Sequence, residues 1–172
     1  QRTVGITEKP ELVPLDKIGR MFGFDPPRDK GRTTVEVVEG VIDGSVQGFI
    51  GLGGNFAHAI SDSARAESAW ERLELNVQVA TKLNRTHLHP GRTSFLLPCL
   101  VRSEEDMQST GPQAVSMECS LSHIHGSVGK NQPASPALLS EIAIIAGIAK
   151  ETLLSNPRVA WDEWAGDYAR IR

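Results

Sequence analysis

Two short polar segments carry residue types that suit a phosphorylated ligand. The first, Gly53-Gly54-Asn55, follows an apolar run, and its glycines let a ligand approach the backbone closely. The Asn side chain and nearby backbone N–H groups can address phosphate or hydroxyl oxygens. The second contains Lys82, Asn84 and Arg85, whose cationic and amide groups suit a diphosphate, a ribose or a base edge. Together they predict a nucleotide site, although a tight turn that binds nothing would explain the two glycines equally well.

The signatures of the commonest nucleotide and hydrolase sites are absent from the sequence. Neither a GxGxxG fingerprint nor a GxxxxGK[ST] loop occurs, which argues against the usual NAD and ATP sites. There is no Gly-x-Ser-x-Gly elbow either, so the presence of serines, histidines and acids does not indicate a hydrolase. The predicted nucleotide site therefore belongs to a less common class.

Metal chemistry is a weaker interpretation of the remaining polar residues. The pairs His87/His89 and His123/His125 lack a third ligand at a recognisable spacing. Cys99 and Cys119 have no Cys-x-x-Cys partner, which excludes an iron–sulfur or structural zinc site carried by cysteines alone, and we expect both to be core thiols. The acidic run 104–106 is best read as solvated charge. We therefore expect no metal ligand and no catalytic residue in this chain.

The composition is that of a globular protein with a real core. Of the 172 residues, 40% are hydrophobic and 23% are charged, and the net charge is -3 with a pI near 6.0. This charge argues against nucleic-acid or membrane-surface binding, because both need a basic footprint. No apolar run approaches the length of a bilayer span, and the N-terminus does not resemble a secretory signal. We expect a cytoplasmic protein.

The two polar segments follow runs that predict consecutive strands of one sheet. Residues 46–52 predict a buried central strand, residues 63–74 a helix capped by Ser61 or Asp62, and residues 75–81 a second strand. A strand–helix–strand order implies a right-handed βαβ unit with parallel strands. A third strand is expected over 95–100, shortened by Pro98. Both polar segments should then lie at the carboxyl edge of a parallel sheet, where α/β proteins bind ligands.

The rest of the chain predicts an arm and further elements of the same domain. We expect residues 1–32 to be an N-terminal arm packed on the domain, with one short helix ending at Gly23, and residues 33–172 to form the domain itself. A helix should begin at Thr33 or Thr34 and end at Gly44. Beyond 101–110, the pattern predicts an edge strand over 113–119 and a long loop over 120–136. A late helix should follow, with Pro136 in its first turn and Ser140 or Glu141 in its interior, and then a final helix carrying Trp161, Trp164 and Tyr168.

Several ordered segments, taken together, resemble one enzyme family. They are GGNF at 53–56, Asp62, TKLNRTH at 81–87, LLPCLVRSEED at 96–106, HIHGSVG at 123–129 and SPALLSE at 135–141. In this order the chain resembles the molybdopterin oxidoreductases, and more narrowly their formate-dehydrogenase-like α subunits. The likeness runs over nearly the whole chain, and the ordered set is far more specific than any single segment.

The resemblance implies a fold and a cofactor. The fold is a Rossmann-like three-layer α/β domain, with a mainly parallel sheet flanked by helices. The cofactor is a molybdopterin guanine dinucleotide, part of a bis-pterin centre with molybdenum or tungsten. By position, the cofactor-binding residues would be Gly53, Gly54, Asn55 and Asp62 in the first loop, and Thr81, Lys82 and Asn84 in the second. Phe56 replaces the usual Pro after the first loop, and Thr-Lys replaces the commoner Ser-Asp of the second.

The resemblance also implies an internal domain of a larger redox enzyme. The family's iron–sulfur region, its metal-ligating residue and its C-terminal barrel have no counterpart in these residues. We expect the fragment alone to be inactive and to hold no bound cofactor. Its partners would be the remaining domains of the parent chain, a small substrate such as formate and, as a candidate, an electron-transfer subunit. The alternative is a free-standing nucleotide-binding or scaffold protein without catalysis.

Overall fold

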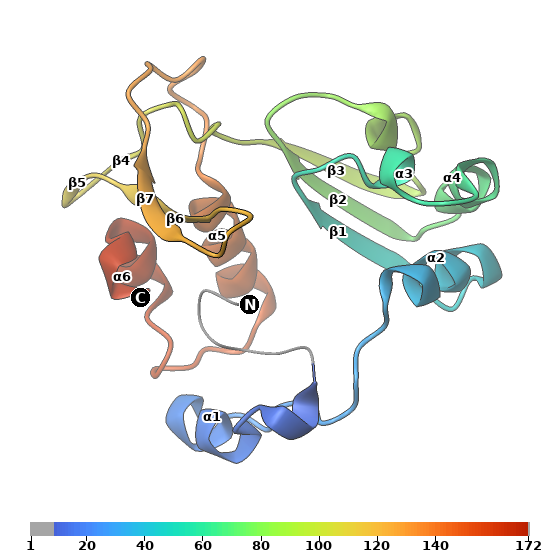
Figure 1. Ribbon diagram of the computed structural model, residues 1–172, viewed down its shortest axis with the longest axis horizontal. Helices are drawn as coiled ribbons and strands as arrows, with labels where there is room; N and C mark the ends of the chain where they lie inside the picture. Colours follow the sequence, from blue (N-terminus) through green and yellow to red (C-terminus); the bar gives the residue numbers. More distant parts are fainter. Residues whose placement is uncertain (1–8, 172) are drawn as a thin grey trace. The chain divides into compact units, whose positions relative to one another are not determined.

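The structure is a computed structural model that describes residues 9–171. The chain divides into two compact units, and each is described by itself (Figure 1). One unit is Arg32–Cys99. The other combines the segment before it with the segment from Leu100 onward. The expectation that residues 1–32 form an arm packed on a domain stays a prediction. Residues 1–8 of that expected arm lie outside the described residues.

Unit Arg32–Cys99 is built on a three-stranded parallel sheet. Its strands are β1 (Gly48–Leu52), β2 (Leu75–Ala80) and β3 (Thr93–Pro98), in the order β1-β2-β3 (Figure 1). The register aligns Ile50 with Val77, and Val77 with Phe95. The predicted parallel strands and the α/β fold class are confirmed, and β3 ends at Pro98 as the proline predicts.

The position of the first strand differs from the prediction. The central strand of the sheet is β2, which is buried along most of its length, whereas β1 pairs on one side only. Ile50 and Leu52 were expected to fill a core, but they are 56% and 53% exposed. The cause is the alternation of side chains along a strand, which directs Phe49 toward the helices and Ile50 and Leu52 to the opposite face.

Local sequence signals mark both ends of only one of the three α-helices of this unit. The helices are α2 (Thr34–Asp43), α3 (Phe56–Ala59) and α4 (Ser63–Trp70), with a 3-10 turn η3 (Arg85–Leu88). The helix α2 starts at Thr34 and ends at Gly44, which has φ 83°, as predicted, and Thr33 and Glu36 form a reciprocal capping box that the sequence analysis did not anticipate. The sequence did not predict α3, and α4 ends four residues before the expected Glu74, whose N–H donates instead to Gln47 O beside β1.

An aromatic cluster holds the helices on the sheet. Trp70 is 1% exposed, and its ring centroid lies 4.7 Å from that of Phe49 and 5.4 Å from that of Phe56. Val41 from α2 and Leu73 complete the same core. Because Phe56 follows the predicted glycine loop directly, this packing fixes where that loop leaves the sheet.

The second unit contains short antiparallel pairs and helices. Its elements are η2 (Pro10–Leu12), α1 (Leu15–Phe22), β4 (Met107–Gln108), β5 (Gly111–Pro112), β6 (Ala114–Glu118), β7 (Ile124–Val128), α5 (Glu141–Thr152), α6 (Trp161–Gly166) and η4 (Tyr168–Arg170). The short helix α1 ends at Gly23 as predicted, with φ 73°. The expected strand over 113–119 is present as β6. The loop prediction for 120–136 was wrong over Ile124–Val128, because this Gly-containing segment becomes the strand β7 by pairing with β6, whereas the residues on either side form no helix or strand.

Two further helix predictions were wrong. Of the two residues expected inside the late helix, Glu141 begins α5, whereas Ser140 caps it. Ser140 Oγ accepts a hydrogen bond from Ala143 N at 3.1 Å, and Pro136 therefore lies before the helix. Tyr168 lies in η4 rather than in the helix of Trp161 and Trp164. Among residues 9–171, no helix combines the length and the apolar character that crossing a bilayer requires.

Tyr168 anchors a buried polar network in this unit. Its side chain is 2% exposed, and its hydroxyl donates to Asp106 Oδ2. Ser140 Oγ lies 2.6 Å from the Tyr168 hydroxyl oxygen and donates to it, because the single tyrosine proton is already used. Gln113 Oε1 accepts from Tyr168 N at 2.9 Å. The network ties η4 to the start of α5 and to the 106–113 segment.

Candidate functional site

The structure brings the two predicted polar loops together. Gly53 N donates to Val79 O at 2.8 Å, which extends the pairing of β1 and β2 to their carboxyl ends. Beyond it, Asn84 Nδ2 donates to Gly54 O at 2.8 Å and joins the second loop to the first. The prediction that both loops lie at one edge of a parallel sheet is therefore confirmed.

The glycine loop leaves open space beside its backbone. Gly53 and Gly54 have φ angles of 69° and 75°, a region that glycine enters without strain. A Cβ placed on Gly54 would meet no atom within 4 Å. A bound group could therefore approach the backbone at Gly54, which is the geometry that an anionic ligand needs to reach main-chain N–H groups.

Thr86 holds the two loops together, and the sequence analysis did not single it out. It is 1% exposed, and its Oγ1 accepts from Ala57 N at 3.1 Å and donates to Asn55 Oδ1 at 3.1 Å. Its backbone N donates to Asn84 Oδ1 at 3.0 Å. No spacing rule points to such a residue, because the two partners of its hydroxyl group lie 29 and 31 positions earlier in the chain.

Asn84 has a structural role in this arrangement. Its Nδ2 is bonded to Gly54 O and its Oδ1 to Thr86 N, so both ends of the amide already have protein partners. The predicted site residue Asn84 therefore orders the loops, and what it retains for a ligand is the second hydrogen of Nδ2.

The basic residues of the second loop differ in their partners. Thr81 and Lys82 are exposed at the end of β2, and within the described part of the chain no hydrogen bond or ion pair engages the Lys82 ammonium group. Arg85 instead makes a bidentate ion pair with Glu67 on α4, with Nε–Oε1 2.5 Å and a second contact of 3.0 Å. We expected both cations to face a ligand, but only Lys82 is unengaged.

Glu67 makes α4 the support of the second loop. Its side chain is 11% exposed, and the hydrogen bond from Arg85 holds the pKa of this carboxyl below its usual range. His89 adds a longer contact, with Nε2 3.6 Å from Glu67 Oε2. The bidentate pair with Arg85 fastens the second loop to α4.

The predicted site residue Asp62 lies outside this hydrogen-bonded core, whereas His87, which was not predicted to bind a ligand, belongs to it. Asp62 occupies the position before α4 with φ 54°, but its carboxylate accepts from Arg65 at 2.7 Å and makes no cap hydrogen bond. Asp62, one of the two expected residues, is thus the N-cap residue of α4, but it makes no side-chain cap hydrogen bond. His87 Nδ1 accepts from Asn84 N at 2.9 Å. Within residues 9–171, no three His, Cys, Asp or Glu side chains are grouped so as to hold a metal ion.

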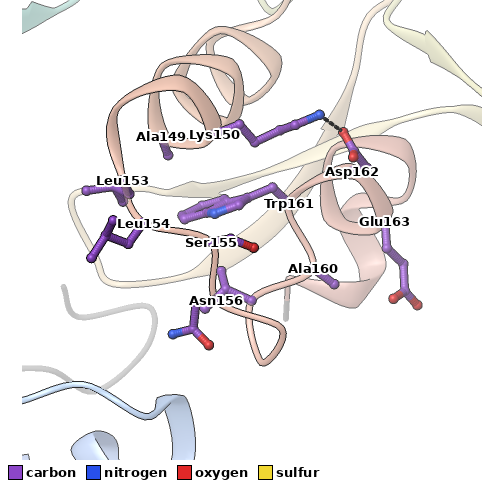
Figure 2. A pocket seen from close by; sticks show the side chains of 11 residues that line it. Ala149, Lys150, Leu153, Leu154, Ser155, Asn156, Ala160, Trp161, Asp162 and Glu163 are labelled. Carbon is purple, nitrogen blue, oxygen red and sulfur yellow. Dashed lines mark hydrogen bonds and ion pairs between the residues drawn. The ribbon is translucent and has the colours of Figure 1, made fainter.

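A groove in the other unit lies between α5 and α6. It has a volume of about 600 Å³, and Figure 2 shows the Trp161 ring inside it, with Leu153 and Leu154 on one side. Lys150 and Asp162 form an ion pair at the rim of this groove, with a distance of 2.5 Å between Lys150 Nζ and Asp162 Oδ1. Leu154 is 95% exposed. The lining mixes apolar and polar side chains and carries an exposed ion pair, so it indicates no particular class of ligand.

The comparisons with known proteins relate this chain to longer relatives. No family model matches it. It is 46% identical over 171 residues to the protein YdeP of Escherichia coli strain K12 and of Shigella flexneri. It is 42% identical over 171 residues to the uncharacterized oxidoreductase Rv2900c of Mycobacterium tuberculosis. Each match covers 99% of this chain and 22% of the relative, so the chain spans about a fifth of their length.

Proposed function

We propose that this chain is the nucleotide-binding part of a larger oxidoreductase, in which it holds one molybdopterin guanine dinucleotide of a molybdenum or tungsten cofactor. The observation that carries the proposal is the pair of hydrogen-bonded loops at the carboxyl edge of a parallel sheet, with open space at Gly54. The name oxidoreductase on a relative 42% identical supports the redox class, and the greater length of the relatives supports further domains in the parent chain.

The residues at the sheet edge fit an anionic dinucleotide. Because Gly53 and Gly54 have no side chains, the diphosphate could come close to their backbone. The Asn55 side-chain amide would donate a hydrogen bond to the ligand. Lys82 would supply the positive charge, because its ammonium is exposed and has no partner among the described residues. Thr81 and Asp62 complete the proposed set, and Asn84 acts mainly by ordering the loops. When bound, the cofactor supplies two-electron redox chemistry, and this chain supplies its binding and orientation.

The activity of the parent protein is a further part of the proposal. From the resemblance, we propose a formate-dehydrogenase-like reaction on a small substrate, with electrons passed to an electron-transfer subunit. A cytoplasmic location also stays a prediction.

The test measures cofactor in the full-length protein. We compare the wild type with Lys82→Glu, Lys82→Gln and Lys130→Glu. For each protein we measure pterin fluorescence after oxidation, GMP released by acid, and metal content per polypeptide. Lys130 is an exposed lysine of the other unit, so its variant controls for the change in charge. If Lys82 makes a charge-assisted contact worth roughly 1.5–3 kcal/mol, Lys82→Glu should lose the most cofactor and Lys82→Gln less. Lys130→Glu should keep as much cofactor as the wild type. Melting temperatures should stay nearly unchanged, since an exposed lysine contributes little to folding.

The possible results separate the alternatives. A wild type without pterin would overturn the proposal. A wild type that binds a guanine nucleotide but carries neither pterin nor metal would support the free-standing nucleotide-binding protein instead. If both Lys82 variants keep the full amount of cofactor at low and at high salt, Lys82 does not contact the cofactor.

A further inference from the structure

We propose that Thr86 is a positioning residue of this site, which orients the Asn55 side chain so that the Asn55 Nδ2 amide is available to the ligand. The inference rests on the proposed function and adds to it a residue that does not itself touch the ligand.

The orientation follows from the hydrogen-bonding capacity of one hydroxyl group. A threonine hydroxyl has one hydrogen to donate and can accept from other donors. Thr86 Oγ1 accepts from Ala57 N, because a backbone N–H can only donate. Its own hydrogen must go elsewhere, and since Thr86 is 1% exposed, water is not the acceptor. Asn55 Oδ1, 3.1 Å away, takes that hydrogen.

This bond decides which way the Asn55 amide faces. If the amide were turned over, Nδ2 would face Thr86 Oγ1, and the hydroxyl hydrogen would lose its acceptor inside the protein. Leaving a buried donor unpaired is unfavourable, so the orientation with Oδ1 toward Thr86 prevails. The Nδ2 amide is then the part of Asn55 with no bonded partner in the described chain, and it lies one residue after the open backbone of Gly54.

The position of Thr86 is itself fixed by the same loops. Its N–H donates to Asn84 Oδ1, and Asn84 Nδ2 donates to Gly54 O. Gly54, Asn55, Thr86 and Asn84 therefore form a closed series of covalent and hydrogen bonds. Preorganised donors bind a ligand more tightly than mobile ones, because the loss of side-chain freedom on binding is smaller.

The experiment is a double-mutant cycle on cofactor release from the full-length protein. Thr86→Val keeps the shape of the side chain and removes the hydroxyl, whereas Thr86→Ser keeps the hydroxyl. Each is made in the wild type and in Asn55→Ala. The readouts are the dissociation rate of the pterin, followed by its fluorescence, and the melting temperature of each variant.

The expected result is coupling between the two residues. Thr86→Val should speed release by about three- to tenfold, the scale of one hydrogen bond, and Asn55→Ala should do at least as much. In the Asn55→Ala background Thr86→Val should add almost nothing, because the group it orients is gone. Thr86→Ser should release the cofactor at nearly the wild-type rate.

Other results would overturn the inference in distinguishable ways. If Thr86→Val speeds release equally in both backgrounds, Thr86 acts through general loop stability and not through Asn55. If it leaves release unchanged while the wild type holds its cofactor, the inference fails and the proposed function stands. If the wild type carries no cofactor, the proposed function fails and the inference falls with it.

Discussion

Replacing Tyr168 with Phe tests the buried polar network of the second unit. The substitution keeps the ring and removes a hydroxyl that donates to Asp106 and accepts from Ser140 at 2.6 Å. Hydrogen bonds to charged groups are worth roughly 1.5–3 kcal/mol, so the free energy of unfolding should fall by about that amount at pH 7.

The loss of unfolding free energy in Tyr168→Phe should depend on pH, because the Tyr168 phenol titrates and the Phe side chain does not. Burial and the hydrogen bond to Asp106 raise the pKa of Tyr168 above its ordinary value of about 10. Above pH 10 the unfolded chain therefore releases a proton that the folded protein keeps, and wild-type stability decreases as the pH rises. At pH 11 one such group removes about 1.4 kcal/mol relative to neutral pH, so the gap between wild type and Tyr168→Phe should narrow by that amount.

Urea unfolding between pH 7 and pH 11, followed by tryptophan fluorescence, measures this gap. Trp161 and Trp164 report on the same unit as Tyr168. Tyr168 is the only tyrosine in the sequence, and all other titrating groups are common to both proteins, so their contributions cancel. A gap that stays constant from pH 7 to pH 11 would refute the reasoning, because it would mean that the phenol titrates alike in the folded and unfolded states.

Three further predictions concern the unit that carries the candidate site. Thr33→Ala removes the capping box of α2 and should lower the free energy of unfolding by about 0.5–2 kcal/mol in urea titrations, with Thr33→Ser restoring it. Trp70→Ala should cost about 3–5 kcal/mol in the same assay, and Trp70→Phe clearly less, because Trp70 is 1% exposed between Phe49 and Phe56. Glu67→Gln should reduce the decrease in unfolding free energy at acid pH. The pKa of Glu67 is lowered in the folded state, so its carboxylate stabilises the fold above the unfolded-state pKa of about 4.3. This stabilisation is lost as the pH falls through the folded-state pKa. An acid limb identical to that of the wild type would show that the Arg85 pair does not form in solution.

Local signals predicted most of the elements that position the site. The helix between Thr33 and Gly44 depends on a cap and a left-handed glycine, and the strand expected over 75–81 and found at Leu75–Ala80 depends on a run of apolar residues, which are properties of neighbouring residues. The sequence also placed both polar loops at one edge of the sheet, because parallel strands joined by a helix all end on the same side.

Contacts between distant residues decided the rest. The segment Ile124–Val128 carries a weak local preference and became a strand only by pairing with Ala114–Glu118. Arg85 reads as a free cation in the sequence, yet the fold places Glu67 beside it and so removes it from the candidate site. Thr86 has no local signal at all, since its importance comes from a buried hydroxyl that meets residues 29 and 31 positions away. Such pairings depend on burial and chain topology, and the sequence determines them only through the whole fold.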